Sequence, residues 1–360
     1  MTSWFRLLHR RAGEQASRRA GEQANKATNI NKVFGMTSNR EKTVAIVQMP
    51  AAVLDSAESM RRAAEHIRDA ARMGAELVVF PETWLSCYPA WVFGMAGWDD
   101  AQAKSWYAKL LADSPAIGAP DAMDDDLAVL REAARSNEVI VVMGMNERSR
   151  QHGGSLYNSL VTIGPDGVIL NVHRKLTPTH TERTVWASGD AAGLKVVETE
   201  VGRLGGLVCW EHWHPLARQA LHAQDEQIHV AAWPDIPEMH HIAARSYAFE
   251  GRCFVLCAGQ YLSTDDVPAE LLAAYRRGVG REAPEAGLLF NGGSGVIGPD
   301  GAWVTSPLFG EPGIVLSKID LSQIDAQRHD LDVVGHYARP DVFELSIDRR
   351  MRTGVNICDA

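Results

Sequence analysis

Short apolar segments, each ended by a turn or a polar residue, recur along most of the chain. They are typical of strands buried on both faces and lie at 43–48, 77–80, 139–145, 204–208, 228–233 and 253–258. Between several of them apolar residues recur at helical spacing, as at 56–73, where Asp55 can cap the helix start. Strand, helix, strand order indicates parallel strand pairs joined by right-handed crossovers.

Two predicted hairpins interrupt this alternation. The turn Gly-Pro-Asp-Gly occurs at 164–167 between residues of strand character and again at 298–301. The repeated turn suggests that two halves of the fold echo each other. Parallel strands with helices, together with added antiparallel pairs, predict an α/β fold of the four-layer α-β-β-α sandwich type in one domain, residues 41–328.

The two ends of the chain differ from this domain. Residues 1–40 carry eight basic and two acidic residues and contain the heptapeptide Arg-Arg-Ala-Gly-Glu-Gln-Ala twice, at 10–16 and 18–24. We expect a disordered extension or a start upstream of a natural beginning at Met36, with a targeting peptide as the alternative. Residues 329–360 lack core periodicity, and we expect this tail to cross a subunit interface.

Composition narrows the functional classes. The net charge of −9 argues against binding to nucleic acid or to an anionic membrane. The segment 263–287 is polar and charged and is interpreted as an insertion, and no apolar run reaches the ~18–20 residues of a spanning helix. Five cysteines, an odd number without framework spacing, favour a reducing cytoplasm.

Cys209 lies where a buried strand, 204–208, meets a predicted helix, 213–223, whose Leu216, Ala217, Ala220 and Leu221 share one face. A sharp strand-to-helix turn exposes a side chain and directs free backbone N–H groups at whatever binds there. The thiol is therefore a candidate nucleophile with an adjoining oxyanion site. The alternative is a small buried core residue.

Three charged residues also occur where buried strands end: Glu82, Glu147 and Lys175. Ligands of an α/β sheet gather at the carboxyl ends of its strands. Glu82 can act as the base for the thiol, Lys175 can stabilise the thiolate and a later anion, and Glu147 can hold Lys175 charged and in place. The alternative is a set of ordinary surface charges at strand ends.

Three motifs resemble the blocks of the nitrilase superfamily: Phe80-Pro81-Glu82, Arg174-Lys175-Leu176 and Val208-Cys209-Trp210-Glu211. The resemblance covers about residues 43–345 and implies a triad of Glu82, Lys175 and Cys209. It also implies that Glu147 is the family's additional structural glutamate.

The segments 175–190 and 335–341 resemble true nitrilases rather than amidases or carbamoylases. The residues at 212–214, His-Trp-His, depart from the common pattern, which bears on substrate range and leaves the chemistry unchanged.

The resemblance implies hydrolysis of a small organic nitrile by water, without cofactor or metal, because each step transfers a proton or an acyl group. Ten tryptophans favour aromatic or arylaliphatic nitriles. The backbone N–H of Trp210 assists Lys175 at the oxyanion, and the predicted substrate pocket is lined by Tyr88, His180, Trp186 and Trp233. The resemblance also implies a dimer-based homo-oligomer, including spiral filaments.

Three alternatives to this interpretation stay open. One is an amidase or cyanide-hydrating relative of the same superfamily. A second is a metal hydrolase that uses His212-x-His214, although i and i+2 point apart on a helix. The third is a non-enzymatic binding or assembly protein on the same fold.

Overall fold

The computed structural model describes residues 40–95, 97–118, 125–279 and 287–351. The two sheets and the helices that cover them belong to one unit, Glu41–Ala360. Except for Arg40, the predicted N-terminal extension lies outside the described residues, as does the end of the tail after residue 351.

The first sheet has six strands in the order β13-β1-β2-β3-β4-β5. Its central strands β1, β2 and β3 are parallel, and its outer pairs are antiparallel. The strands are β1 (Glu41–Gln48), β2 (Leu77–Val79), β3 (Ile140–Arg148), β4 (Leu156–Ile163), β5 (Ile169–Arg174) and β13 (Gly313–Asp320).

The second sheet runs β10-β11-β9-β8-β7-β6, with β12 paired to β11. It repeats the same plan, since β7, β8 and β9 are parallel and their neighbours are antiparallel. The strands are β6 (Val197–Thr199), β7 (Gly202–Val208), β8 (Ile228–Trp233), β9 (Phe254–Gly259), β10 (Tyr261–Ser263), β11 (Leu288–Ile297) and β12 (Trp303–Phe309).

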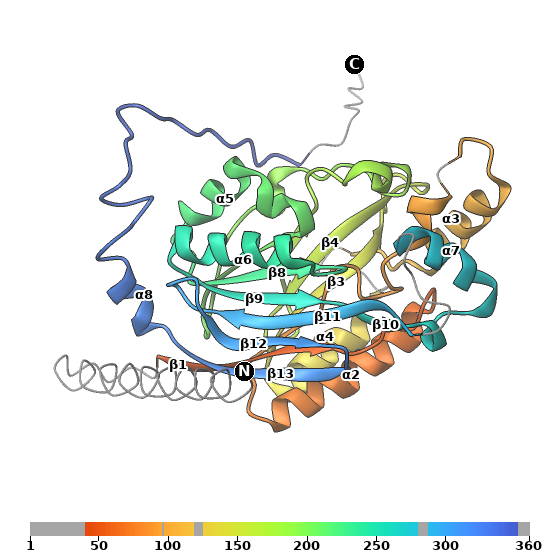
Figure 1. Ribbon diagram of the computed structural model, residues 1–360, viewed down its shortest axis with the longest axis horizontal. Helices are drawn as coiled ribbons and strands as arrows, with labels where there is room; N and C mark the ends of the chain where they lie inside the picture. Colours follow the sequence, from red (N-terminus) through yellow and green to blue (C-terminus); the bar gives the residue numbers. More distant parts are fainter. Residues whose placement is uncertain (1–39, 96, 119–124, 280–286, 352–360) are drawn as a thin grey trace, which may run out of the picture. The chain divides into compact units, whose positions relative to one another are not determined.

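Helices cover the outer face of each sheet (Figure 1). Helices α2 (Ser56–Arg72) and α4 (Ala128–Asn137) pack on the first sheet, and α5 (Pro215–His222) and α6 (Glu238–Gly251) pack on the second. Successive residues of β1 point to opposite faces of the first sheet. Ala45 packs in the core beneath the helices, whereas Val44 packs in the core between the two sheets. The layers confirm the predicted α-β-β-α sandwich.

The remaining helices lie at the ends of the sandwich, α3 (Ala101–Asp113) and α7 (Ala269–Val279) at one end and α8 (Ser322–Gln327), which follows the last strand, at the other (Figure 1). The short 3-10 turns are η1 (Ala90–Gly94), η2 (His180–Thr184), η3 (Ala191–Gly193), η4 (Cys209–Trp213) and η5 (Thr264–Asp266). Helix α2 is capped as predicted, with the Asp55 side chain accepting a hydrogen bond from Glu58 N. The described residues after α8, up to 351, contain neither helix nor strand.

The two predicted hairpins have matching turns. The N–H of Gly167 donates to Gly164 O at 2.9 Å, and the N–H of Gly301 donates to Gly298 O at 2.8 Å. Gly167 and Gly301 have φ angles of +79° and +76°, a left-handed conformation that favours glycine. The repeated sequence therefore forms the same backbone turn in both halves.

Two local expectations differ from the structure. The helix after Cys209 begins at Pro215 because the 3-10 turn η4 occupies residues 209–213, and Leu216 is exposed rather than on the buried face. The polar segment 263–287 contains helix α7, whose Tyr275 is buried and donates a hydrogen bond to Tyr88 O. Among the described residues, no helix is both long and apolar enough to cross a membrane.

Candidate active site

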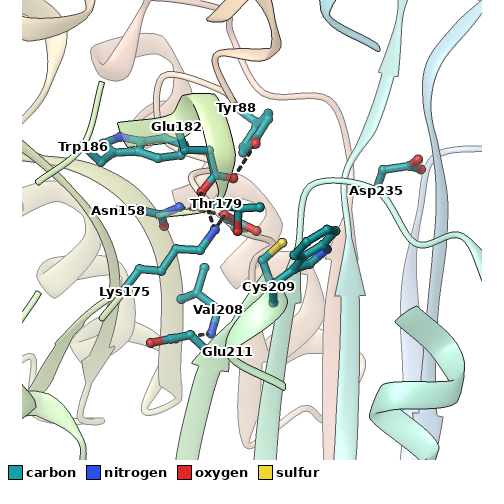
Figure 2. A network of polar contacts seen from close by, with 12 residues as sticks. Tyr88, Asn158, Lys175, Thr179, Glu182, Trp186, Val208, Cys209, Glu211 and Asp235 are labelled. Carbon is teal, nitrogen blue, oxygen red and sulfur yellow. Dashed lines mark hydrogen bonds and ion pairs between the residues drawn. The ribbon is translucent and has the colours of Figure 1, made fainter. Parts of the chain in front are cut away.

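Three of the predicted residues meet between the sheets at the carboxyl ends of their strands. Glu82 follows β2, Lys175 follows β5 and Cys209 follows β7, and all three side chains are buried. Figure 2 shows the Lys175 ammonium directed toward Glu182, with the sulfur of Cys209 nearby. The rule that polar groups gather at strand ends therefore places this part of the site correctly.

Lys175 lies between two carboxylates. Its Nζ is 3.0 Å from Glu82 Oε1 and 2.8 Å from Glu182 Oε2. An oxygen of Glu82, an oxygen of Glu182 and the sulfur of Cys209 lie within 4.8 Å of one another. Two carboxylates and a thiol are groups that can bind a metal ion. Here both carboxylates already form ion pairs with the Lys175 ammonium. The cluster thus groups two carboxylates and a thiol around a fixed ammonium.

Glu82 has one occupied and one available oxygen. Oε1 accepts a hydrogen bond from Asn158 Nδ2 at 2.6 Å in addition to its contact with Lys175, whereas Oε2 has no partner among the described residues. The backbone oxygen of Glu82 accepts a hydrogen bond from the side chain of Gln260. The carboxylate is therefore held by one oxygen and can receive a proton on the other.

Cys209 occupies a strained turn. Its φ angle is +52°, in the left-handed region that costs a residue with a side chain about 1–3 kcal/mol. Glu211 fastens this turn, because its carboxylate accepts hydrogen bonds from the N–H groups of Val208 and Leu176, both at 2.8 Å, and contacts His173 Nε2 at 2.9 Å. Burial opposes ionisation of Glu211, but His173 and the two backbone N–H groups together outweigh burial and lower its pKa.

Burial and charge together set the resting protonation. Burial raises the pKa of Glu82 to about 7, with Lys175 opposing and Glu182 assisting this shift. Burial and the nearby Glu82 raise the pKa of Cys209 well above its ordinary value. Burial disfavours the ammonium of Lys175, but its acidic neighbours outweigh burial and raise its pKa. The site at rest therefore holds a neutral thiol, a charged lysine and a carboxylate able to act as a base near neutral pH.

The prediction that Glu147 holds Lys175 is wrong. Glu147 is buried, but it accepts hydrogen bonds from Arg174 Nη2 at 2.5 Å and from Ser159 Oγ at 2.6 Å. Neighbouring residues on a strand point to opposite faces, so a group that meets Arg174 faces away from Lys175. The second partner of Lys175 is Glu182.

Sequence reasoning missed this role for Glu182, which is seven residues after Lys175. Its carboxylate also accepts hydrogen bonds from Tyr88 Oη at 2.6 Å and from Thr179 N at 2.6 Å. The pattern Thr179-x-x-Glu182 is a capping box at the start of η2, and this is the sequence signal that could have indicated an inward-facing glutamate.

Two of the predicted pocket residues adjoin the charged cluster. Tyr88 and Trp186 are buried, with ring centroids 5.6 Å apart, and the Trp186 ring centre is 5.9 Å from Lys175 Nζ. The indole of Trp186 is held by Asn146 at 2.9 Å. These two side chains form an aromatic wall beside Lys175.

The other predicted pocket residues lie elsewhere. Trp233 is buried and stacks between His212 and His240, at centroid distances of 4.7 Å and 4.3 Å. His180 is exposed and lines an open groove with Trp210, whose half-exposed indole donates to His240 Nε2 at 3.0 Å. None of the three side chains forms a hydrogen bond, ion pair or ring contact with Glu82, Lys175 or Glu182 in the described structure, whereas the backbone N–H of Trp210 favours the thiolate of Cys209.

The two histidines of the alternative metal site do not converge. His212 is buried and its Nδ1 lies 2.7 Å from Cys209 O. His214 instead accepts a hydrogen bond from Ala217 N at 3.4 Å and caps the start of α5. The i, i+2 spacing thus separates the rings, as expected.

The four-layer sandwich thus brings a buried carboxylate, ammonium and thiol together at its strand ends. Residues 43–329 match the carbon-nitrogen hydrolase family, and the chain belongs to this family. Solved structures with 18–20% sequence identity share the fold. They include the C. elegans NitFhit protein (TM-score 0.63, covering 86% of this chain and 67% of that one) and Saccharomyces cerevisiae Nit3 (TM-score 0.63, covering 82% and 96%).

Curated relatives identify the branch within the family. An aliphatic nitrilase of Rhodococcus rhodochrous is 35% identical over 88% of this chain and 82% of its own length. An arylacetonitrilase of Macrophomina phaseolina is 35% identical (87% and 92%), and nitrilase 1 of Arabidopsis thaliana is 34% identical (91% and 92%). The chain belongs to the nitrilase branch of this superfamily.

Proposed function

We propose that this protein is a nitrilase that converts an organic nitrile and water to the carboxylic acid and ammonia. The observation that carries this proposal is the proximity of the Cys209 thiol to Glu82 and Glu182 around the Lys175 ammonium, within 4.8 Å for the three acidic groups. Its relatives named nitrilases support the nitrile as the substrate.

The first half of the reaction forms a covalent bond to sulfur. The free oxygen of Glu82 takes the thiol proton, the sulfur of Cys209 attacks the nitrile carbon, and Glu82 passes its proton to the nitrile nitrogen, which gives a thioimidate and restores the carboxylate. Water then adds with Glu82 again acting as base. Lys175 and the N–H of Trp210 stabilise the resulting tetrahedral intermediate.

The second half releases the products. Collapse of the tetrahedral intermediate expels ammonia and leaves a thioester on Cys209. A second water, deprotonated by Glu82, attacks this thioester and releases the carboxylic acid and the thiol. If the first tetrahedral intermediate expels the thiol instead, the product is an amide.

The same charged cluster could also serve an amidase or a cyanide-hydrating enzyme. The deciding experiment supplies one nitrile and its own amide separately at equal concentration, and follows ammonia, acid and amide by chromatography. We expect the nitrile to give mostly acid and the amide to be consumed slowly. An amide consumed faster than its nitrile would make the protein an amidase.

We also propose a cytoplasmic homo-oligomer built from dimers, with the tail, residues 329–360, in a subunit interface. Large apolar side chains of the described tail are exposed, among them Tyr337, Val342 and Phe343, and burial against another copy would remove them from water. The thiols of Cys87, Cys209, Cys253 and Cys257 are all free, which suits a reducing compartment.

A further inference from the structure

A line of buried polar side chains extends from the backbone of Cys209 into the layer between β8 and α6. His212 Nδ1 is 2.7 Å from Cys209 O, and His212 Nε2 is 3.0 Å from His229 Nε2. His229 Nδ1 is 2.8 Å from Glu226 Oε1, and Tyr247 Oη donates to Glu226 Oε2 at 2.6 Å. All four side chains of this line are buried, and we call it the histidine chain.

Hydrogen-bond chemistry fixes the direction of the histidine chain. A carbonyl oxygen only accepts, so His212 must carry its proton on Nδ1, which leaves Nε2 of a neutral ring as an acceptor. His229 must therefore donate from Nε2. The remaining nitrogen of His229, Nδ1, faces Glu226 Oε1, and one proton must lie between these two atoms for a hydrogen bond to form.

Burial favours the neutral form of every member. It raises the pKa of Glu226 to about 8, with Tyr247 and His222 opposing the shift. It lowers the pKa of His229 well below its ordinary value and, with the help of His229, lowers that of His212 to about 3. Near neutral pH the proton therefore resides on Glu226, which donates to His229.

We infer that Glu226, His229 and His212 are positioning residues for Cys209, and that they act through one buried proton shared by Glu226 and His229. With that proton on Glu226, each hydrogen bond of the histidine chain is donated in the same direction: Glu226 donates to His229, His229 to His212, and His212 to the carbonyl oxygen of Cys209. This bond restrains a residue held at a φ angle of +52°, next to the backbone N–H groups of the proposed oxyanion site. The inference rests on the proposed function only for its activity assay.

Loss of that proton to solvent would reverse the histidine chain. With Glu226 ionised, neutral His229 must donate from Nδ1 to the carboxylate, which makes its Nε2 an acceptor. His212 must then donate from Nε2 to His229, and its bare Nδ1 faces Cys209 O. Each ring keeps one proton and one proton leaves in total, yet the last contact changes from a hydrogen bond to the repulsion of two lone pairs.

The surroundings of Glu226 leave little room for another arrangement. A Cβ atom added at Gly205 of β7 would lie 2.0 Å from Glu226 Oε1. The titratable and charged groups facing the histidine chain come from every element around it: Arg218 and His222 of α5, Tyr247 and Glu250 of α6, His240 at the start of α6, Cys253 after it, Glu211 of η4 and His173 of β5.

The experiment compares kcat and KM for one nitrile from pH 6 to pH 10 in wild type and two variants. In Glu226→Gln the amide can donate to His229 and accept from Tyr247, but it cannot lose a proton. In the control, His222→Gln, the altered ring packs beside Tyr247 at a centroid distance of 4.5 Å and forms no hydrogen bond to the described residues.

We expect wild-type kcat to fall about tenfold per pH unit above the pKa of Glu226 with KM unchanged, because the histidine chain contacts Cys209 rather than substrate. His222→Gln should keep the alkaline fall, at the wild-type pH or somewhat above it because the variant removes a group that lowers the pKa of Glu226, whereas Glu226→Gln should keep its kcat across this range. A Glu226→Gln enzyme with the same alkaline loss, or one that is folded but inactive at pH 7, would overturn the inference, as would a flat wild-type profile.

Infrared difference spectroscopy of wild type against Glu226→Gln provides a measurement that needs no substrate, and the subtraction removes the band of Glu82, whose pKa of about 7 lies close by. The remaining carbonyl band of a protonated carboxylic acid should disappear with the same pKa as the alkaline fall in kcat, and a band that is absent at pH 7 or titrates elsewhere would contradict the shared proton. If the wild type hydrolyses no nitrile at any pH, the proposed function fails while this band still tests the histidine chain.

Discussion

Replacement of Glu182 by glutamine tests the charge balance around Lys175. Glu182 is buried and accepts three hydrogen bonds, from Lys175, Tyr88 and Thr179. Glutamine has the same size and keeps an acceptor, but it removes one of the two negative charges that the buried ammonium contacts. Lys175 should then interact more strongly with Glu82.

The expected loss of activity in Glu182→Gln follows from the ion pair between Glu182 and Lys175, which the substitution breaks. Removal of one partner of a buried ion pair costs about 3–5 kcal/mol, and hydrogen bonds to neutral groups are about half as strong as those to charged ones. Because glutamine retains part of the contact, we expect a loss of about 2 kcal/mol, which is roughly a 30-fold fall in kcat/KM if it falls on the transition state.

The direction of the pH shift gives a sharper readout. Glu182 helps to raise the pKa of Glu82, so its neutralisation should move the acidic limb of kcat/KM to lower pH. The matched control is Glu147→Gln, because Glu147 is also buried but pairs with Arg174. We expect Glu147→Gln to have a lower Tm, a kcat within about threefold of wild type, and an acidic limb of kcat/KM at the wild-type pH.

The assay measures kcat/KM for one nitrile between pH 5 and pH 9, with Tm recorded for each variant. The reasoning is refuted if Glu147→Gln shifts the limb and Glu182→Gln does not, or if the limb of Glu182→Gln moves to higher pH.

Further predictions concern Glu82, Lys175 and the two ends of the chain. Wild-type kcat/KM should rise with pH through about 7, because Glu82 must lose a proton to act as base, and Glu82→Gln should abolish activity at every pH. Lys175→Arg should lose at least about 100-fold in kcat, since a planar guanidinium cannot replace a compact ammonium between two buried carboxylates; activity within tenfold of wild type would mean that only the charge matters. Deletion of residues 1–35 should leave activity and Tm unchanged, whereas deletion of 329–360 should reduce the assembly size in size-exclusion chromatography, and a profile that matches wild type would exclude the tail from the interface.

The fold could be predicted because its signals are local. Buried strands such as β2 and β9 are continuous apolar runs, Asp55 caps α2 as its side chain predicts, and the same glycine turn forms both hairpins. The placement of Leu216 on the buried face was wrong, whereas Ala217, Ala220 and Leu221 of the same predicted face are buried. Because the 3-10 turn η4 precedes the helix, α5 begins only at Pro215 and Leu216 lies in its first turn. Helical periodicity does not indicate where the first α-helical turn begins.

Part of the site could also be predicted from local sequence signals. Glu82, Lys175 and Cys209 follow buried strands, and strand ends converge at one edge. Glu147 was misassigned because the preceding strand residues are apolar on both faces, so alternation does not reveal the side to which Glu147 points.

For other members of the site, strand ends and periodicity give no signal. Glu182 lies in a loop without periodicity, and its inward position depends on the Thr179 capping box. The histidine chain joins Glu226 and His229 of one segment to His212 of another, which no local pattern connects.

The most direct test of the account is to find where a substrate carbon becomes attached. Wild-type protein is mixed with a nitrile, quenched in acid within a few turnovers, digested and analysed by mass spectrometry, with Cys209→Ala treated in parallel. We expect the acyl or imidoyl mass on the peptide containing Cys209, and neither adduct nor turnover in folded Cys209→Ala. An adduct on Cys87, Cys253 or Cys257, or nitrile turnover by Cys209→Ala above trace level, would contradict the proposed nucleophile.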